Sequence, residues 1–421
     1  MKLKLHWQIL IAIVLASVIG WAAGEDGAIA GVRLYPVFDF LGTLFINALK
    51  MLIVPLIASS IIVGIAGIGS KGDLGKLGGQ TVACYAVTTL SAILVGLVLV
   101  NIVRPGIVNG EPAGKLLALE VDSGAVAEQI GDKGAADVIE VFLRAVPPNI
   151  IDAAGKGEML GIIFFCVLFG FFMSRLEHGL AEPLFNFWSG VFQVMMKITE
   201  WVMKFAPIGV FGLVARVVAR TGFDAAKPLL IFAIVVLLAL AIHVFVTLSL
   251  LLKWVGRVSP MAALRTMSSA MLMAFSTASS SATLPVTLEC LEKGAGVSNR
   301  TTSFVLPLGA TVNMDGTALY ECMAALFLAQ AYGLELGFVT QFSVVVVALL
   351  TSVGVAGIPS ASLVAIAIIL AAIGLPVEAI GVLFVFDRIL DMARTSVNVF
   401  GDSTCAILVA RFQGETGILE K

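Results

Sequence analysis

Residues 308–330 read LGATVNMDGTALYECMAALFLAQ, a stretch apolar enough to lie in a membrane although it contains Asn313 and Asp315. Charged groups at membrane depth cost about 2.5–3.5 kcal/mol each even on the lenient insertion scale, and they usually mark a substrate or ion pathway. Alternate positions of a regular helix point to different faces. The two side chains can therefore serve one site only where the helix is unwound, which Gly309 and Gly316 permit. Freed carbonyl groups, together with carboxylate and amide oxygens, suit a hard cation such as Na⁺.

The whole chain has the composition of a polytopic membrane protein. Hydrophobic residues make up 59% of its 421 positions, 13% are charged and the mean hydropathy is +1.04, whereas soluble domains average about 25% charged residues. The net charge of −2 indicates no nucleic-acid partner. Apolar runs long enough to cross about 30 Å of hydrocarbon predict an all-α protein of the cell membrane with about eight spanning helices. These runs cover residues 5–23, 36–69, 80–103, 158–176, 184–218, 228–255, 300–331 and 376–410.

Two hydrophobic segments in the C-terminal half are interrupted by small polar residues. They cover residues 270–288 and 347–370, and each has a serine-rich centre with a proline between apolar arms of about ten residues. Arms of that length are too short to span a bilayer, so both segments are expected to be re-entrant hairpins. Each is followed by a long apolar helix with an Asn and a Gly near its middle, and such paired interruptions indicate repeats around a transporter binding site. The alternative for these serines and glycines is close helix packing.

The last apolar run has a polar stripe. Residues 387–403 read DRILDMARTSVNVFGDS, and five polar side chains in it recur every three or four positions, which places them on one helix face. An internal ion pair would account for Asp391 and Arg394. Five polar side chains on one face are more than such a pair requires, and they indicate a substrate or ion pathway. The stripe consists of Asp391, Arg394, Thr395, Asn398 and Asp402.

The sequence contains no signature of catalysis or of a bound cofactor. Its five cysteines have no C-x-x-C spacing and its three histidines no H-E-x-x-H spacing, so neither a disulfide framework nor a zinc site is indicated. An intramembrane serine hydrolase using Ser279–Ser281 is the alternative from another class, but no histidine lies near those serines in the sequence to act as a general base. We therefore expect that the protein is not an enzyme and has no cofactor, with Na⁺ as a coupling ion.

Three motifs resemble one known family. LGATVNMDGTALYE, the serine run followed by ATLP, and DRILDMARTSVNVFGD are similar to the glutamate/aspartate transporter family, the dicarboxylate/amino acid:cation symporters. The resemblance covers most of the chain and implies eight transmembrane helices, two re-entrant hairpins, inverted repeats and a homotrimer in which a transport domain slides past a scaffold. The implied boundaries are scaffold helices in 1–79, a transport-domain helix in 80–103, an external loop in 104–157, scaffold helices in 158–220, and a transport domain in 221–421 with hairpins at 258–295 and 336–373.

The resemblance also implies site residues. Arg394 would bind the side-chain carboxylate of the substrate and Asp391 its amino group. Further substrate contacts would come from Thr317, Thr395 and Asn398 and from hairpin backbone near Ala278, Ser280 and Ile358. One sodium site would use Gly309, Asn313, Asn398 and Asp402; a second would use Thr311, Ser352, Val353 and Val355; and a third would use Tyr85, Thr88, Thr89, Asn313 and Asp315. Helix packing is the alternative for the tyrosine and the two threonines of the third site.

Glu321 is the expected proton carrier. Archaeal sodium–aspartate members of the family have Gln at this position, whereas animal members that co-transport a proton have Glu. A carboxyl group desolvated at membrane depth favours its neutral form, which agrees with that role. The alternative is a Glu that is hydrogen-bonded for structure. Relatives often place an additional arginine at one of two positions that here hold Ala278 and Met392, a departure that bears on countertransport.

The sequence therefore predicts a secondary active symporter of glutamate or aspartate, driven by Na⁺, H⁺ or both through elevator-type alternating access. A proton-driven importer of C4-dicarboxylates such as succinate, malate or fumarate is the alternative. Asp391 favours amino acids, because a dicarboxylate has no ammonium group to pair with a buried carboxylate.

Overall fold

The computed structural model describes residues 5–29, 31–69, 75–119, 146–156, 159–352 and 362–419. These residues are mostly helical, which confirms the predicted all-α class. The exceptions are two antiparallel hairpins of two-residue strands in the connections. They are β1 (Ala28–Ile29) with β2 (Val32–Arg33), and β3 (Ile107–Val108) with β4 (Glu111–Pro112).

All eight apolar runs form helices. The first five correspond to α1 (Leu5–Ala23), α2 (Leu34–Gly69), α3 (Gly75–Val103), α7 (Met159–Met173) and the pair α8 (His178–Met203) and α9 (Ala206–Thr221). The sixth contains α10 (Ala226–Ile242) and two π-helical segments, η2 (His243–Leu248) and η3 (Leu251–Val255). The last two correspond to α13 (Asn299–Val312) with α14 (Asp315–Ala331), and to α17 (Phe384–Phe412). A short helix, α6 (Ile150–Lys156), precedes α7.

The helices differ in how well each could cross a membrane by itself. Within the described ranges, three are long and apolar enough by length and composition: Leu34–Gly67, Lys76–Val103 and Ala226–Val255. The other runs give helices that are shorter, broken or rich in polar residues. Such helices depend on neighbours to cover their polar groups.

The fifth run, predicted as one span over 184–218, forms a bent pair of helices that together are long and apolar enough to count as a single broken span. α8 and α9 are bent by 53° at the two residues between them. Pro207, in the first turn of α9, has no backbone N–H and cannot continue the hydrogen-bond ladder of α8.

The first predicted hairpin is present. It consists of α11 (Pro260–Thr277), α12 (Ser280–Glu289) and the π-helical η4 (Cys290–Ala295), and α11 packs on α12 and on η4. The chain reverses at Ala278, whose φ of 50° is left-handed, and the Ser279 hydroxyl then accepts a hydrogen bond from the backbone N–H of Ala282. This hydroxyl caps the N-terminus of α12.

The first arm of this hairpin is longer than the ten residues expected from the apolar pattern. α11 has 18 residues, because the Ser259 side chain caps its N-terminus and Pro260 occupies the first turn, where a missing N–H is harmless. The helix therefore begins well before the apolar segment does.

The second predicted hairpin has two helical arms, α15 (Phe338–Ser352) and α16 (Ser362–Ile373), which pack on each other. Its tip, residues 353–361, lies outside the described residues, and Val353, Val355 and Ile358 are part of it. A 3₁₀ segment, η5 (Val377–Leu383), leads from α16 into α17.

The seventh run is unwound beside Asp315, as predicted for a segment whose Asn313 and Asp315 side chains serve one cation site. α13 ends at Val312 and α14 begins at Asp315, and between them Asn313 (φ −107°, ψ 87°) and Met314 (φ −115°, ψ 65°) are not helical. Gly316 has a different role from the expected one. It lies in the first turn of α14, where a Cβ atom would approach the carbonyl oxygen of Arg394 to 2.8 Å. This glycine therefore allows α14 and α17 to approach closely.

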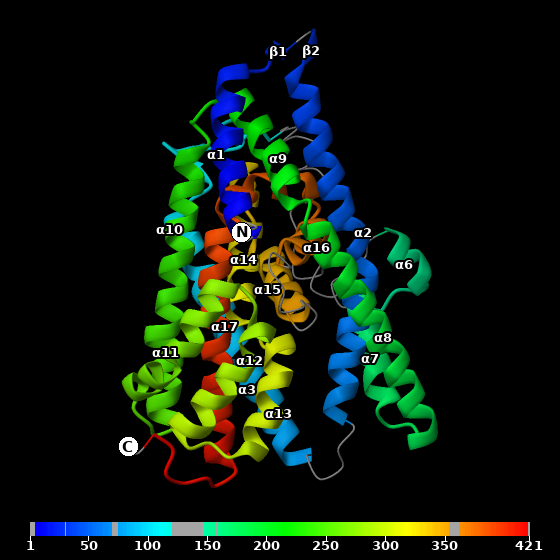
Figure 1. Ribbon diagram of the computed structural model, residues 1–421, viewed down its shortest axis with the longest axis vertical. Coiled ribbons are helices and arrows are strands. Elements are labelled where there is room, and N and C mark those ends of the chain that lie inside the picture. The colour runs from blue at the N-terminus through cyan, green and yellow to red at the C-terminus, as the bar shows by residue number, and fades with distance from the viewer. Residues whose placement is uncertain are drawn as a thin grey trace.

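Two groups of helices are distinguished by their packing. α2 packs against α7, α8 and α9, and α1 against α9, whereas α3 and the helices from α10 to α17 pack mainly on one another. In Figure 1, α10 and α11 lie on the left of α17, and α7 and α8 lie on the right of the molecule. The ion pair between Lys50 of α2 and Glu378 of η5, 2.6 Å long, connects the two groups.

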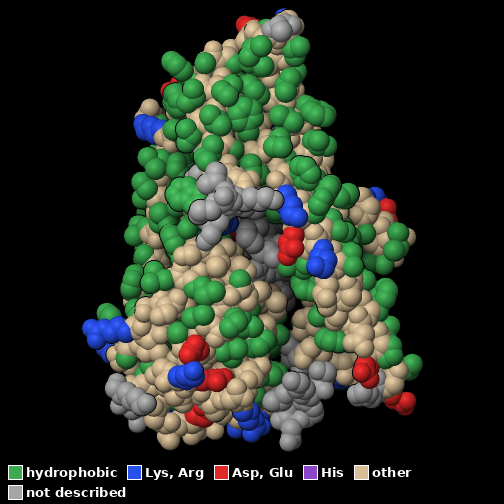
Figure 2. Space-filling view, in the orientation of Figure 1, with side chains coloured by type: hydrophobic (Ala, Val, Ile, Leu, Met, Phe, Trp, Pro, Cys, Tyr) green, Lys and Arg blue, Asp and Glu red, His purple; other side chains and the backbone are tan. Residues whose placement is uncertain are grey.

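Hydrophobic side chains cover much of the outer surface. Figure 2 shows them over the upper part of the molecule, where α1, α2, α9 and α10 lie, whereas Lys, Arg, Asp and Glu gather mainly at the lower end. Trp7, Val14, Trp21 and Phe40 are among the large exposed apolar residues of this region. A surface of this kind is suited to contact with lipid chains.

The C-terminal segment folds back onto the start of α13. The carboxylate of Glu415 accepts hydrogen bonds from the Ser298 backbone N–H (2.8 Å), the Ser298 hydroxyl (2.6 Å) and the Thr301 hydroxyl (2.6 Å). Burial raises the pKa of this carboxyl group, but the hydrogen bonds outweigh burial and hold the pKa below its ordinary value. The segment thus stabilises the N-terminus of the helix that leads to Asn313.

Candidate functional site

The polar stripe of α17 faces the protein interior. All five of its members are buried, and α17 is a continuous helix throughout the stripe. Ser396 on the same helix donates a hydrogen bond of 2.8 Å to the Met271 carbonyl of α11, so the first hairpin lies against α17. Ala278 and Ser280 at the hairpin turn are also buried.

Arg394 is the centre of the stripe and is completely buried. Its Nη2 donates to Asp387 Oδ1 and to Asp391 Oδ1, both at 3.0 Å. Its Nε and Nη1 are buried and have no hydrogen-bond partner among the described residues. A buried charged donor without a partner is costly, so these two nitrogens indicate where a ligand would bind.

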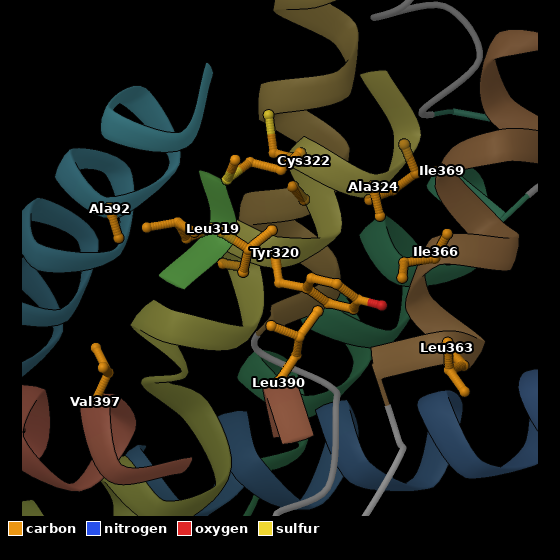
Figure 3. Packing of buried hydrophobic residues seen from close by; sticks show 14 of the residues in the cluster. Ala92, Leu319, Tyr320, Cys322, Ala324, Leu363, Ile366, Ile369, Leu390 and Val397 are labelled. Carbon is orange, nitrogen blue, oxygen red and sulfur yellow. The ribbon is translucent and has the colours of Figure 1, made fainter. Parts of the chain in front are cut away.

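Tyr320 of α14 supports the guanidinium group from one face. The Cζ atom of Arg394 lies 3.9 Å from the centre of the Tyr320 ring, a cation–π contact. Figure 3 shows Tyr320 among buried apolar side chains, with Leu390 of α17 below its ring and Ile366 of α16 on the side of its hydroxyl group. Sequence reasoning missed both Tyr320 and Asp387. Asp387 could have been found, because it lies seven residues, or two helical turns, before Arg394 on the same face.

Asn398 joins α17 to the first turn of α14. Its Oδ1 accepts hydrogen bonds from the backbone N–H groups of Gly316 (2.8 Å) and Thr317 (3.3 Å), and its Nδ2 donates to the Thr317 hydroxyl at 3.0 Å. The Asn398 side chain therefore caps α14 from a different helix. The Thr395 hydroxyl instead donates to the Asp391 carbonyl of its own helix at 2.8 Å.

A cluster of oxygen atoms surrounds the unwound segment. Asn313 Oδ1 accepts from the Thr88 and Thr89 hydroxyls, both at 3.2 Å, and Asn313 Nδ2 donates to Asp402 Oδ1 at 2.9 Å. The Thr89 hydroxyl also donates to Asp315 Oδ1 at 2.8 Å. Two carboxylates, an amide and two hydroxyls from α3, α14, α17 and the unwound segment thus meet in a fully buried place, and hard monovalent cations prefer such oxygen ligands.

Other residues expected at cation sites have contacts of their own. The Tyr85 hydroxyl donates to the Val305 carbonyl of α13 at 2.5 Å. The hydroxyls of Thr311 and Ser352 donate to carbonyls within their own helices, those of Leu308 and Leu349. The structure therefore brings Asp402 of the first predicted set, and Thr88 and Thr89 of the third, into contact with Asn313. Asn398 of the first set contacts Gly316 and Thr317 instead. The second set is described only at Thr311 and Ser352.

Gly309 and Gly401 allow the two carboxylates to approach helix backbone. A Cβ atom on Gly309 would lie 2.5 Å from Asp402 Oδ1 and 3.0 Å from the Tyr85 hydroxyl oxygen, and one on Gly401 would collide with Asp315 Oδ2. A larger residue at either position would have to displace a carboxylate of the oxygen cluster.

His243 was not anticipated as a neighbour of this cluster. Its Nε2 lies 3.4 Å from Asp315 Oδ2, both side chains are fully buried, and its Nδ1 has no partner in the described part of the chain. The only sequence signal was a histidine within the apolar run 228–255. Its partner is 72 residues away in the sequence.

Glu321 connects α14 to the second hairpin. Its Oε2 accepts a hydrogen bond of 3.0 Å from the Thr351 hydroxyl of α15, whereas its Oε1 is buried with no partner among the described residues. It lies one helical turn after Thr317, on the helix that also provides Tyr320. A carboxyl group half satisfied in this way is suited to hold or to release a proton.

Known transport proteins resemble this chain over nearly its whole length. The family described as "Sodium:dicarboxylate symporter family" matches residues 5–412. The chain is 36% identical to the "Proton/sodium-glutamate symport protein" of Geobacillus stearothermophilus over 98% of this chain and 96% of the relative. It is 35% identical to the "Proton/glutamate-aspartate symporter" of Escherichia coli (strain K12), over 98% and 93%, and 34% identical to the "C4-dicarboxylate transport protein" of Bacillus subtilis (strain 168), over 98% and 95%.

Proposed function

The chain belongs to the sodium:dicarboxylate symporter family, and from this premise we propose that it imports an acidic amino acid, glutamate or aspartate, together with Na⁺, H⁺ or both. The observation that carries the proposal is Arg394, a fully buried guanidinium group beside Asp391, two of whose nitrogens have no partner among the described residues. Relatives named as glutamate and aspartate symporters support the same substrate class.

The two ends of an amino-acid substrate would bind oppositely charged groups. The planar fork of Arg394 can bind a carboxylate through two parallel N–H groups, and Nε and Nη1 are the nitrogens that have no partner within the described ranges. Asp391 would receive the ammonium group. The Thr317 hydroxyl and the Asn398 amide lie at the neighbouring helix terminus and would bind the second carboxylate.

The coupling ions would bind in the oxygen cluster and at Glu321. Asp315, Asp402 and Asn313 would bind Na⁺ with the hydroxyls of α3. The hydrogen bond that Asn398 accepts from the start of α14 would connect this cluster to the substrate groups. Binding of one ligand would thus favour the geometry that the other requires, which is thermodynamic coupling.

The two groups of helices would be the moving and the fixed parts of an elevator in the cell membrane. Residues 1–79 and 158–220 would form the scaffold of a homotrimer. The helix of 80–103 and residues 221–421 would form the transport domain, and 104–157 would be an external loop. The packing supports this division, because most contacts of α1, α2, α7, α8 and α9 are with one another, and most contacts of α3 and α10–α17 are likewise within their own group. Sliding would break contacts between the groups, of which the Lys50–Glu378 ion pair is one.

Transport by the purified protein in liposomes tests the proposal. Radiolabelled aspartate and glutamate are supplied while inward Na⁺, inward H⁺ and outward K⁺ gradients are imposed one at a time. Accumulation above equilibrium driven by a Na⁺ or H⁺ gradient is expected. Filling only to equilibrium under every gradient would contradict symport.

Replacing Glu321 by Gln is expected to preserve exchange of internal for external substrate while removing the pH dependence of net uptake. The amide retains the shape of the side chain and its contact with Thr351 but cannot carry a proton. Exchange and net uptake are measured in the same liposomes between about pH 5 and pH 8, the range in which proton-coupled groups act. Glu335→Gln, at an exposed carboxyl group, is the control. Lumen acidification that still accompanies substrate entry in Glu321→Gln would rule this residue out as the proton carrier.

Replacing Gly309 by Ala is expected to weaken Na⁺ binding about 10-fold, because overpacking costs about 1–3 kcal/mol and the new methyl group would displace the Asp402 carboxylate. The measurement is the rise in melting temperature with Na⁺ concentration, since an ion that binds only the folded state stabilises it. Gly190→Ala in α8, where a Cβ atom would meet nothing within 4 Å, is the matched control. Identical Na⁺ dependence of both variants would exclude Gly309 and Asp402 from the Na⁺ site.

A C4-dicarboxylate importer remains the second candidate, because one relative carries that name. In the serine run, the Ser279 hydroxyl caps the N-terminus of α12. The difference between the two transport functions depends on whether Asp391 requires an ammonium group.

A further inference from the structure

Arg388 is a buried arginine that the functions proposed above do not use. It lies on α17 one helical turn before Asp391, and its side chain is 8% exposed. Its Nη1 lies 3.5 Å from Asp391 Oδ2, and its Nε is buried without a hydrogen-bond partner in the part of the chain that the structure describes. Asp391 is therefore placed between two guanidinium groups, with Arg394 Nη2 at 3.0 Å from its other oxygen.

Two carboxyl groups and two guanidinium groups form a buried cluster on α17. They belong to Asp387 and Asp391 and to Arg388 and Arg394. An uncompensated charge in such a place is strongly destabilising. Each carboxylate oxygen of Asp391 thus lies beside a guanidinium group, Oδ1 beside Arg394 and Oδ2 beside Arg388, so its charge has partners within the protein.

We propose that Arg388 is the specificity-determining residue that allows this site to accept dicarboxylates as well as acidic amino acids. The inference rests on the proposed function, since it concerns the same substrate site. An incoming ammonium group must share Asp391 with Arg388, and the repulsion between the two cations weakens amino-acid binding. A dicarboxylate meets an Asp391 whose charge is already neutralised, so its binding is weakened less than it would be beside an unpaired carboxylate.

The first test uses the unmodified protein. Succinate and aspartate compete with radiolabelled aspartate for the purified transporter at a saturating Na⁺ concentration and constant pH. Leaving a buried charge unpaired costs about two to four decades in affinity. With Asp391 compensated by Arg388, succinate is expected to bind within about 100-fold of aspartate, and weaker binding than that would overturn the inference.

The second test changes Arg388 to Met, which removes the charge but retains much of the side-chain volume. Aspartate is expected to bind more tightly and succinate more weakly, so the ratio of their dissociation constants should rise about 10-fold or more. Arg388→Lys, which retains the positive charge, is the matched control and should leave the ratio nearly unchanged. Arg388→Gln repeats the test with a polar side chain if the Met variant is not recovered folded.

The outcomes separate a specificity role from a structural one. An equal loss of affinity for both acids in the uncharged variants would mean that Arg388 only supports the fold. The double variant Arg388→Met with Asp391→Asn should not show the 10-fold rise, because the carboxylate that Arg388 neutralises is gone. If the unmodified protein binds neither aspartate nor glutamate, the proposed function itself fails. An unchanged ratio in a variant that still binds aspartate refutes only the role of Arg388.

Discussion

Uptake of glutamate and aspartate is expected to be lost when Arg394 is replaced by Cys. The guanidinium group is fully buried, stacks on Tyr320 and has two nitrogens without a partner among the described residues, so a substrate carboxylate would be the missing ligand. Removing one partner of a buried ion pair costs about 3–5 kcal/mol, which corresponds to about two to four decades in affinity. The variant also leaves Asp387 and Asp391 without their shared donor, which adds repulsion against an acidic substrate.

The measurement for Arg394→Cys is competition binding followed by uptake into liposomes, with acidic and neutral amino acids compared. We expect selectivity to shift toward neutral amino acids, because the charge that selects the side-chain carboxylate has been removed. Arg216→Cys is the matched control, since Arg216 also forms an ion pair with an aspartate, Asp39, at 2.7 Å, but outside the site. Unchanged aspartate affinity in Arg394→Cys would refute its assignment as the carboxylate-binding group.

Replacing Asp315 or Asp402 by Asn is expected to flatten the Na⁺ dependence of substrate binding. If these carboxylates bind Na⁺, substrate affinity must rise with Na⁺ concentration by reciprocal linkage, and each substitution should reduce that dependence by about one ion. Asn has the shape of Asp, so it fits beside Gly309 and Gly401, where a larger residue would not. The loss can then be attributed to charge.

Substrate affinity is measured over a range of Na⁺ concentrations at constant ionic strength, so that screening does not change. Asp152→Asn serves as the control, because Asp152 is exposed and pairs with Lys156 on a short helix of the connecting region. Both site variants retaining the full Na⁺ dependence would exclude these carboxylates as ligands. Substrate binding that is indifferent to Na⁺ in the unmodified protein would instead indicate that protons drive transport.

The local features of the site could be predicted from the sequence because they depend on helix geometry within one segment. Side chains three or four positions apart share a face, so spacing alone predicts that Asp391, Arg394 and Asn398 lie together. Asn313 and Asp315 could act together only where their helix is unwound, and the break between α13 and α14 lies at that point. The all-α class likewise followed from apolar runs of membrane-spanning length.

Contacts between helices distant in sequence were decided only by the tertiary structure. Thr89 reaches Asp315 across 226 residues, and His243 reaches the same carboxylate across 72. No periodicity connects such positions, because the packing of α3 and of η2 on the core determines which of their faces points inward. For the threonines of α3 the sequence offered only a resemblance, and for His243 it offered no partner.

The pairing of charges on α17 was also determined partly by the sequence and partly by the tertiary structure, within a single helix. The sequence placed Asp387, Arg388, Asp391 and Arg394 within two turns, but several pairings among them were equally compatible with that spacing. The structure assigns one nitrogen of Arg394 to both carboxylates and places Arg388 beside Asp391. That arrangement depends on Tyr320 of α14 stacking on the guanidinium group of Arg394. Helical periodicity therefore determined which side chains of α17 could meet. The packing of α14 against α17 decided which nitrogens of Arg394 remain available for a substrate, because side-chain rotamers are selected by the neighbours that surround them.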